Sequence, residues 1–141
     1  MIDALPLIPH EKPMVFIDHL IEISEFAAIA ELKITSDLLF HEPRGLPTWT
    51  SIELMAQTVS AYAGYRAQSL NTPPKIGFLL GTRKLHLPVE FFEDGETVRI
   101  KVEQNYVHEG LGQFSCEIEY KNYRFDATIN VFEPHDAVEP N

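Results

Sequence analysis

A single helical stretch inside a chain of alternating strands constrains the fold most. It runs from Ser51 to Leu70, and its apolar residues recur at the spacing of one helix face: Ile52, Met55, Ala56, Val59 and Ala63. Small side chains are dense along this stretch, so other elements can pack closely around it. The segment Asn71-Thr72-Pro73-Pro74 then ends the helix. The spacing therefore predicts one long, largely buried helix over 51–70.

Strands are predicted on both sides of this helix. Before it, Met14–Ile23 is apolar and rich in β-branched residues, and Phe26–Thr35 alternates like a hairpin partner. Four more strand candidates follow the helix: Ile76–Leu87, Thr97–His108, Phe114–Tyr120 and Tyr123–Phe132. Only Lys121-Asn122 separates the last two, which is the length of a tight hairpin. Asp94-Gly95 and Gly110-Leu111-Gly112 are the other predicted turns.

The order of two strands, one helix and four strands indicates an α+β fold. We expect the hot-dog arrangement, in which a curved antiparallel sheet of five to six strands wraps one long central helix. Such a sheet keeps free edges, so pairing with a second hot-dog chain is expected. The chain has 141 residues, and we expect a single domain over 1–132 followed by a loose acidic tail over 133–141.

Composition narrows the classes of function. The net charge is −10, and nucleic-acid binding needs clustered basic residues, so this partner is not expected. Cys116 is the only cysteine and lies in an alternating stretch, which favours a buried apolar role. No pair of histidines has the spacing of metal ligands, so neither a metal nor a cofactor is expected. The sequence has no apolar run near 18 residues and no signal peptide pattern, which predicts a cytoplasmic protein without membrane insertion.

Two side chains near the helix start suggest chemistry. His41 lies in a proline-rich loop, and Glu53 lies in the first turn of the helix. Eliminating water from a 3-hydroxyacyl thioester needs a base that titrates near neutral pH, such as histidine, and an acid, such as a glutamate that burial keeps protonated. However, Thr50-Ser51-Ile52-Glu53 also matches a capping box, in which Glu53 bonds the Thr50 N–H. The residues alone leave both roles open for Glu53.

Several segments together resemble a known enzyme family. In chain order, they are Ile8–Asp18, with its Pro9-His10 and Pro13, then His41-x-Pro43, Pro47 followed by Glu53-Leu54-Met55-Ala56-Gln57, and Leu85–Val89 followed by Asp94-Gly95. This series resembles the FabZ-type 3-hydroxyacyl-carrier-protein dehydratases. Trp49 and Gly77–Arg83 look closer to one subgroup, the ApeP-like proteins of aryl polyene biosynthesis clusters.

The resemblance implies a site and its partners. His41 would be the base and Glu53 the acid, contributed by different protomers of a homodimer or of a heterodimer with a FabZ-like subunit. The substrate would be a 3-hydroxyacyl chain on an acyl carrier protein, and the product a trans-2-enoyl thioester. Implied substrate-binding residues are Pro47, Trp49, Met55, Ala56, Leu79, Leu80 and Gly81. Implied carrier-binding residues are Arg44, Arg83 and Lys84.

The sequence departs from the family pattern around both candidate residues. Phe40, Arg44 and Thr48 stand where the family has glycines, and the spacing from His41 to Glu53 is two residues shorter. These changes motivate a second hypothesis, a non-catalytic partner subunit of a FabZ-like dehydratase. A third hypothesis is a hot-dog acyl thioesterase, in which one carboxylate on the helix activates water.

Overall fold

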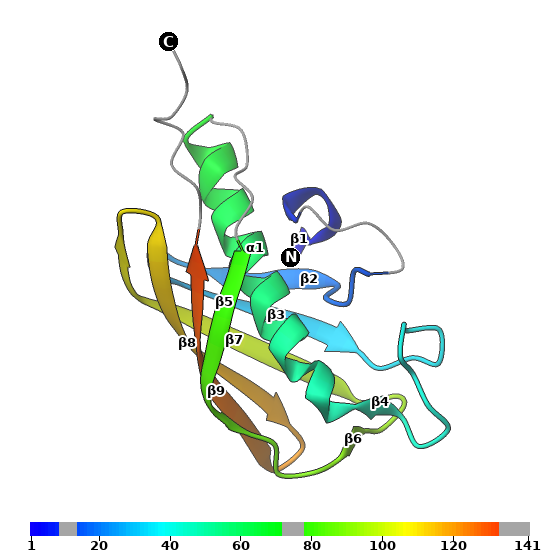
Figure 1. Ribbon diagram of the computed structural model, residues 1–141. Helices are drawn as coiled ribbons and strands as arrows, with labels where there is room; N and C mark the ends of the chain where they lie inside the picture. Colours follow the sequence, from blue (N-terminus) through cyan, green and yellow to red (C-terminus); the bar gives the residue numbers. More distant parts are fainter. Residues whose placement is uncertain (9–13, 72–77, 133–141) are drawn as a thin grey trace.

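The computed structural model describes residues 1–8, 14–71 and 78–132. In these ranges one long helix, α1 (Ser51–Ser69), lies across a seven-stranded antiparallel sheet (Figure 1). The strands of this sheet are, along the chain, β1 (Ile2–Asp3), β2 (His19–Ile23), β3 (Ala27–Lys33), β5 (Phe78–His86), β7 (Thr97–His108), β8 (Leu111–Tyr120) and β9 (Tyr123–Phe132). Their order in the sheet is β1-β2-β3-β7-β8-β9-β5. The predicted α+β hot-dog fold is confirmed.

In the part of the chain that the structure describes, two short strands and two 3-10 turns complete the architecture. The strands β4 (Leu46–Pro47) and β6 (Phe91–Phe92) pair with each other beside the start of α1. The turns are η1 (Leu5–Leu7) and η2 (Thr48–Thr50), and η2 leads directly into α1. The large sheet has seven strands instead of the predicted five to six, because the two-residue β1 adds a strand beside β2. A two-residue strand is too short to produce a periodic sequence signal.

Other predicted boundaries need correction. The first predicted strand, from Met14, begins only at His19. Met14 and Phe16 bond to Gln57 of the helix instead of to a neighbouring strand, and the Asp18 N–H then donates to the Glu31 carbonyl oxygen of β3. The β7–β8 turn consists of Glu109-Gly110, both with positive φ, because Leu111 already pairs with His108. The predicted turn Lys121-Asn122 is confirmed. The predicted tail over 133–141 lies outside the described residues.

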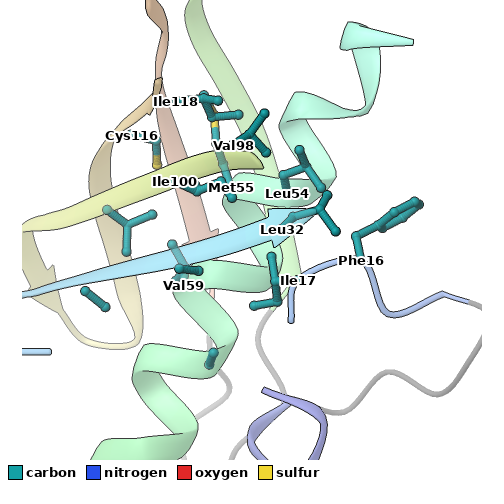
Figure 2. Close-up of a cluster of buried hydrophobic side chains, with 14 of the residues drawn as sticks. Phe16, Ile17, Leu32, Leu54, Met55, Val59, Val98, Ile100, Cys116 and Ile118 are labelled. Carbon is teal, nitrogen blue, oxygen red and sulfur yellow. The ribbon is translucent and has the colours of Figure 1, made fainter. Parts of the chain in front are cut away.

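The hydrophobic core lies between α1 and the sheet. Figure 2 shows Leu54, Met55 and Val59 of α1 close to buried side chains of β7 and β8, among them Ile100 and Ile118. Along β7 and β8, buried residues alternate with residues that point away from the helix, which are mostly polar or charged. The sheet therefore has one apolar face under α1 and one largely polar face.

Small residues let the chain pack tightly on α1, as the sequence predicted. At Gly64, a Cβ atom would lie 2.0 Å from the Leu7 carbonyl oxygen of η1, so a side chain has no room there.

Within the described ranges, no helix combines the length and apolar character needed to cross a bilayer.

Candidate active site

Glu53 lies in the first turn of α1 and is held by a buried glutamine. The Gln57 side-chain amide donates to Glu53 Oε1 at 3.0 Å and to the Met14 carbonyl oxygen at 2.6 Å. Its own carbonyl oxygen accepts the Phe16 N–H at 2.9 Å. Gln57 is completely buried, so these bonds form away from competing water. One amide thus ties Glu53 and the segment 14–16 to the same place on the helix.

The capping box predicted for Glu53 is at most half formed. Thr50 is the residue at the N-cap, but its hydroxyl donates to the Pro47 carbonyl oxygen at 2.7 Å and makes no bond to a helix N–H. Thr48 is also turned away from the helix, because its hydroxyl donates to the Val89 carbonyl oxygen at 2.5 Å. Both threonines therefore fasten η2 to segments outside α1. This geometry weakens the capping interpretation, which needs the Thr50 hydroxyl as its first member.

His41 lies in the loop between β3 and β4 and faces an aspartate. Its Nε2 is 2.6 Å from Oδ1 of Asp94, which belongs to the turn before β7. The His41 side chain is 13% exposed, and that of Asp94 is 54% exposed. Sequence reasoning identified Asp94 only as a turn residue. No local pattern reveals this contact, because the two residues are 53 positions apart.

Phe40 keeps a backbone shape that usually requires glycine. Its φ is +70°, in the left-handed region that residues other than glycine rarely adopt. This is a position where the resemblance places a glycine. The Phe40 ring contacts Phe16, with ring centres 6.4 Å apart, and Trp49, with ring centres 5.2 Å apart. These contacts offset part of the strain, so the loop keeps its turn just before His41 without a glycine.

A second turn follows His41 and depends on Gly45. Glu42 and Gly45 exchange two backbone hydrogen bonds of 2.9 Å, which closes a tight turn with Pro43 and Arg44 at its tip. Gly45 has φ +127°, and a Cβ there would lie 2.2 Å from the Phe92 carbonyl oxygen. The family's glycine, which Arg44 replaces, is therefore present one residue later.

The aromatic pair joins the two halves of the candidate site. Phe40 immediately precedes His41, and Trp49 lies in η2 immediately before α1, which carries Glu53. Both rings are largely exposed, Phe40 by 47% and Trp49 by 54%. His41 and Glu53 themselves have different partners, Asp94 and Gln57. Within one chain, the base and acid predicted from the sequence therefore belong to neighbouring but separately held groups.

Comparison with known proteins identifies the family. The model of the ApeP-like family, described as ApeP dehydratase, matches residues 2–140. The chain belongs to the ApeP-like dehydratase family. The resemblance stated from the sequence is thus confirmed. None of the curated protein sequences matches the chain significantly.

Solved structures with the same fold include the dehydratase heterocomplex ApeI:P from Xenorhabdus doucetiae. It superposes with a TM-score of 0.87 and 24% identity over 97% of this chain and 94% of that chain. A hypothetical thioesterase from Streptococcus pneumoniae with coenzyme A superposes with a TM-score of 0.62 and 14% identity, over 82% of this chain and 86% of that chain. Protein smu.793 from Streptococcus mutans, bound to acetyl CoA, superposes with a TM-score of 0.65 and 9% identity, over 89% of this chain and 94% of that chain. At these identities, the likeness shows a shared fold.

In this ApeP-like chain, the predicted substrate-binding residues fall into two groups, one around the start of α1 and the other on β5. Pro47 is buried in β4, Met55 is fully buried beneath α1, and Ala56 is half-buried beside it. Trp49, in contrast, is exposed. Leu79, Leu80 and Gly81 lie instead on β5, the last strand of the sheet, where the pairing with β9 shifts between Leu79 and Gly81. Leu79 and Leu80 are largely exposed, and no atom of the described residues lies within 4 Å of a Cβ placed on Gly81.

The predicted carrier-binding cations occupy different places. Arg44 lies 3.4 Å from Glu90, with its guanidinium 4.6 Å above the Phe91 ring. Arg83 and Lys84 lie on β5, and Lys84 lines a surface recess with Lys101 of β7. Arg44 lines a second recess, with Lys121. Carboxylates line both recesses, Glu103, Glu117 and Asp126 in the first and Glu90 and Glu93 in the second, so the predicted cations form no continuous basic patch in the described residues.

Neither a metal cluster nor a reactive thiol accompanies the site. In the part of the chain that the structure describes, no three His, Cys, Asp or Glu side chains are grouped to hold a metal. Cys116 is buried in β8, and this burial raises the pKa of its thiol to about 12. The thiol therefore stays protonated at neutral pH and packs as a small apolar group, which confirms the role predicted from the sequence.

Proposed function

We propose that this chain is a subunit of a dehydratase that removes water from a 3-hydroxyacyl thioester on an acyl carrier protein. The product would be a trans-2-enoyl thioester in aryl polyene or fatty-acid-type synthesis. The observation that carries the proposal is the left-handed backbone of Phe40. It explains how a loop with a substituted glycine still turns sharply before His41, which answers the main objection that the sequence raised.

The proposed chemistry uses one base and one acid. His41 takes a proton from the carbon next to the thioester carbonyl, and the electron pair moves toward the carbonyl oxygen as an enolate forms. Glu53 gives its proton to the 3-hydroxyl as the carbon–oxygen bond breaks, so water leaves and the double bond forms. Gln57 donates to Glu53 Oε1 and so orients the carboxyl group that gives up the proton. Backbone N–H groups at the start of α1 can stabilise the enolate oxygen.

A second hot-dog subunit would complete the site. In this proposal, His41 of one protomer works together with Glu53 of the other, as the family resemblance implies. The strand β5 lies at an edge of the sheet and exposes Leu79 and Leu80, which would be covered if another sheet paired there. The fold neighbour from Xenorhabdus doucetiae is a heterocomplex, which favours a FabZ-like partner over a second copy of this chain.

The exposed aromatic pair supports an extended apolar substrate. Phe40 and Trp49 expose ring surface directly beside His41 and the start of α1. Flat conjugated chains stack well on such rings, and their burial would offset the cost of exposing both rings to water. We therefore propose that the acyl chain passes over Trp49, which agrees with its predicted role.

Turnover of a 3-hydroxyacyl thioester tests the proposal. The purified chain is assayed alone and together with a co-expressed FabZ-like subunit, while enoyl absorbance and free thiol are followed. We expect enoyl product, and a loss of about 10²- to 10⁴-fold in Glu53→Gln and in His41→Ala. The matched controls are Glu22→Gln and His108→Ala, which change an exposed glutamate and an exposed histidine away from the site.

The two alternatives give different results in the same assay. If the complex turns over substrate and neither Glu53→Gln nor His41→Ala changes the rate, the chain is a non-catalytic partner subunit. Release of free thiol without enoyl product identifies a thioesterase. The second outcome is worth measuring because two fold neighbours are structures with coenzyme A or acetyl CoA.

A further inference from the structure

The contact between His41 and Asp94 is unusually close for a histidine and a carboxylate of this chain. Nε2 and Oδ1 are 2.6 Å apart, slightly closer than the about 2.7–2.9 Å that is usual for a charge-assisted N–H···O hydrogen bond. Two other such pairs in the described residues are much looser. His19 is 3.5 Å from Asp3, and His108 is 3.9 Å from Glu109. The His41–Asp94 pair is also the one next to the candidate site.

Both partners are held by their backbones. The Asp94 turn is fixed because the Gly95 N–H donates to the Ile34 carbonyl at 2.9 Å and the Glu93 N–H donates to the Tyr120 hydroxyl at 2.9 Å. On the other side, the His41 N–H donates to the Leu38 carbonyl at 3.1 Å, and the neighbouring Phe40 ring contacts two other rings. Two short side chains that extend from fixed loops have little freedom to separate.

This geometry determines which nitrogen of His41 carries the proton. An ionised aspartate only accepts hydrogen bonds, and a neutral imidazole has one N–H and one lone pair. A close bond from Nε2 to the carboxylate therefore requires the proton on Nε2, and the lone pair remains on Nδ1. The His41 side chain is not fully buried, since 13% of it is accessible.

We propose that Asp94 is a positioning residue that fixes the Nε2–H tautomer of His41, so that Nδ1 is the atom that accepts the substrate proton. The inference rests on the proposed function, in which His41 is the base. In the proton transfer, the bond between the substrate carbon and hydrogen breaks, the new N–H bond forms at Nδ1, and the electron pair of the broken bond stays with the enolate. Asp94 remains ionised and faces the imidazolium that results. In serine proteases, too, an aspartate bonds one protonated ring nitrogen of a histidine so that the other ring nitrogen accepts a proton, but the two nitrogens are exchanged.

The tautomer can be measured directly by NMR. Long-range ¹H–¹⁵N correlation on the full chain, at a pH where its histidines are neutral, separates protonated from unprotonated ring nitrogens, and His41→Gln identifies the His41 signals. We expect a protonated Nε2 and an unprotonated Nδ1. Asp94→Asn keeps the size of the side chain but can also donate to Nε2, so it should produce a mixture of tautomers. The matched control is Glu109→Gln, which removes the carboxylate beside His108 and should leave the His41 signals unchanged.

Kinetics of the complex provide the second readout. Asp94→Asn should lower kcat by roughly 10- to 1,000-fold with KM nearly unchanged, and Asp94→Glu should restore part of it, by analogy with loss of the tautomer-fixing carboxylate in serine proteases. A His41 protonated on Nδ1, or an unaltered tautomer in Asp94→Asn, would overturn the inference. If no variant or wild-type complex dehydrates substrate, the proposed function fails while the NMR result still decides the role of Asp94.

Discussion

Glu53 and His41 are held in the molecule in opposite ways. Glu53 lies on α1, whose buried side packs on the sheet, and it is braced by a glutamine with no exposed surface. His41 lies on a loop built from turns, between the left-handed Phe40 and the constrained Gly45, and it faces another loop. The helix start is determined by burial, and the loop is determined by backbone geometry.

This difference predicts different sensitivities in the two regions. Changes at the helix start should act through packing and buried hydrogen bonds, because its polar groups are shielded from water. Changes in the loop should act through steric limits on the backbone, because positive φ angles leave little room for a side chain. Measurements on four residues, Cys116, Gly45, Gln57 and Ser51, can test that division.

If α1 closes the core, the Cys116 thiol beneath it should be nearly unreactive. Burial raises its pKa from 9.0 to about 12, so the thiolate fraction at pH 8 should be about 10³-fold lower than in the unfolded chain. Alkylation rates with and without urea measure the ratio. Below pH 9 the thiol is protonated in both states, whereas between about pH 9 and 12 only the unfolded chain releases the proton. Stability should therefore fall as pH rises through that window. Equal alkylation rates would mean that α1 does not cover this side of the sheet.

The loop should be most sensitive at Gly45. Gly45→Ala places a Cβ against the Phe92 carbonyl oxygen at a positive φ, so we expect a loss of about 3 kcal/mol or more in the free energy of unfolding. Gly95→Ala is the matched control, because Gly95 also has a positive φ but a Cβ added there would meet no atom of the described ranges within 4 Å. It should lose only about 1 kcal/mol. Equal losses in urea denaturation would show that strain, and not the close approach, limits the loop.

The helix start should be most sensitive at Gln57. Gln57→Leu leaves the Phe16 N–H and the Met14 carbonyl without their partner, so we expect a loss of about 2 kcal/mol. Gln68→Leu, on the exposed part of the same helix, should stay within about 0.5 kcal/mol of the parent. A neutral Gln57→Leu would mean that packing alone holds the segment 14–16 against α1.

At Ser51 we expect a modest gain in stability instead of a loss. The Ser51 hydroxyl is fully buried and, among the described residues, has no hydrogen-bond partner. Ser51→Ala removes this cost and improves helix propensity, so the free energy of unfolding should rise by about 1 kcal/mol. Thr58→Val makes the opposite test, because the Thr58 hydroxyl bonds the Leu54 carbonyl at 2.8 Å and its loss should destabilise. A destabilised Ser51→Ala in urea denaturation would indicate an unrecognised partner for that hydroxyl.

The sequence predicted the parts of the fold that repeat locally. Along β7, buried Val98, Ile100 and Val102 alternate with exposed charged residues, so the strand and its inward face follow from the pattern. The helix was predictable for the same reason. The ladder of β4 with β6 was not predictable, because two-residue strands carry no period and their pairing depends on the tertiary structure.

The sequence proposes residues for the candidate site, but it does not reveal how these residues contact one another. The motif that includes Glu53 also contains Gln57, but the spacing alone does not show that Gln57 bonds Met14 and Phe16. The contact of Asp94 with His41 is long-range and therefore invisible to local patterns. From the sequence, Phe40 in place of a glycine suggested an altered loop. The sequence could not show that the Phe40 ring is stabilised by Phe16 and Trp49, because these two rings come from other segments.

The strand order has a consequence for how the chain folds. The strands β7, β8 and β9 are consecutive and joined by two-residue turns, so their pairing closes very short loops. By contrast, β3 reaches β7 only across the whole helical region, with Ala30 opposite Ile100. Short loops close at low entropic cost, so we expect the three-stranded meander to form first and to offer its apolar face to α1. Substitutions in the β8–β9 turn should then slow folding, whereas those in the β2–β3 hairpin should mainly speed unfolding.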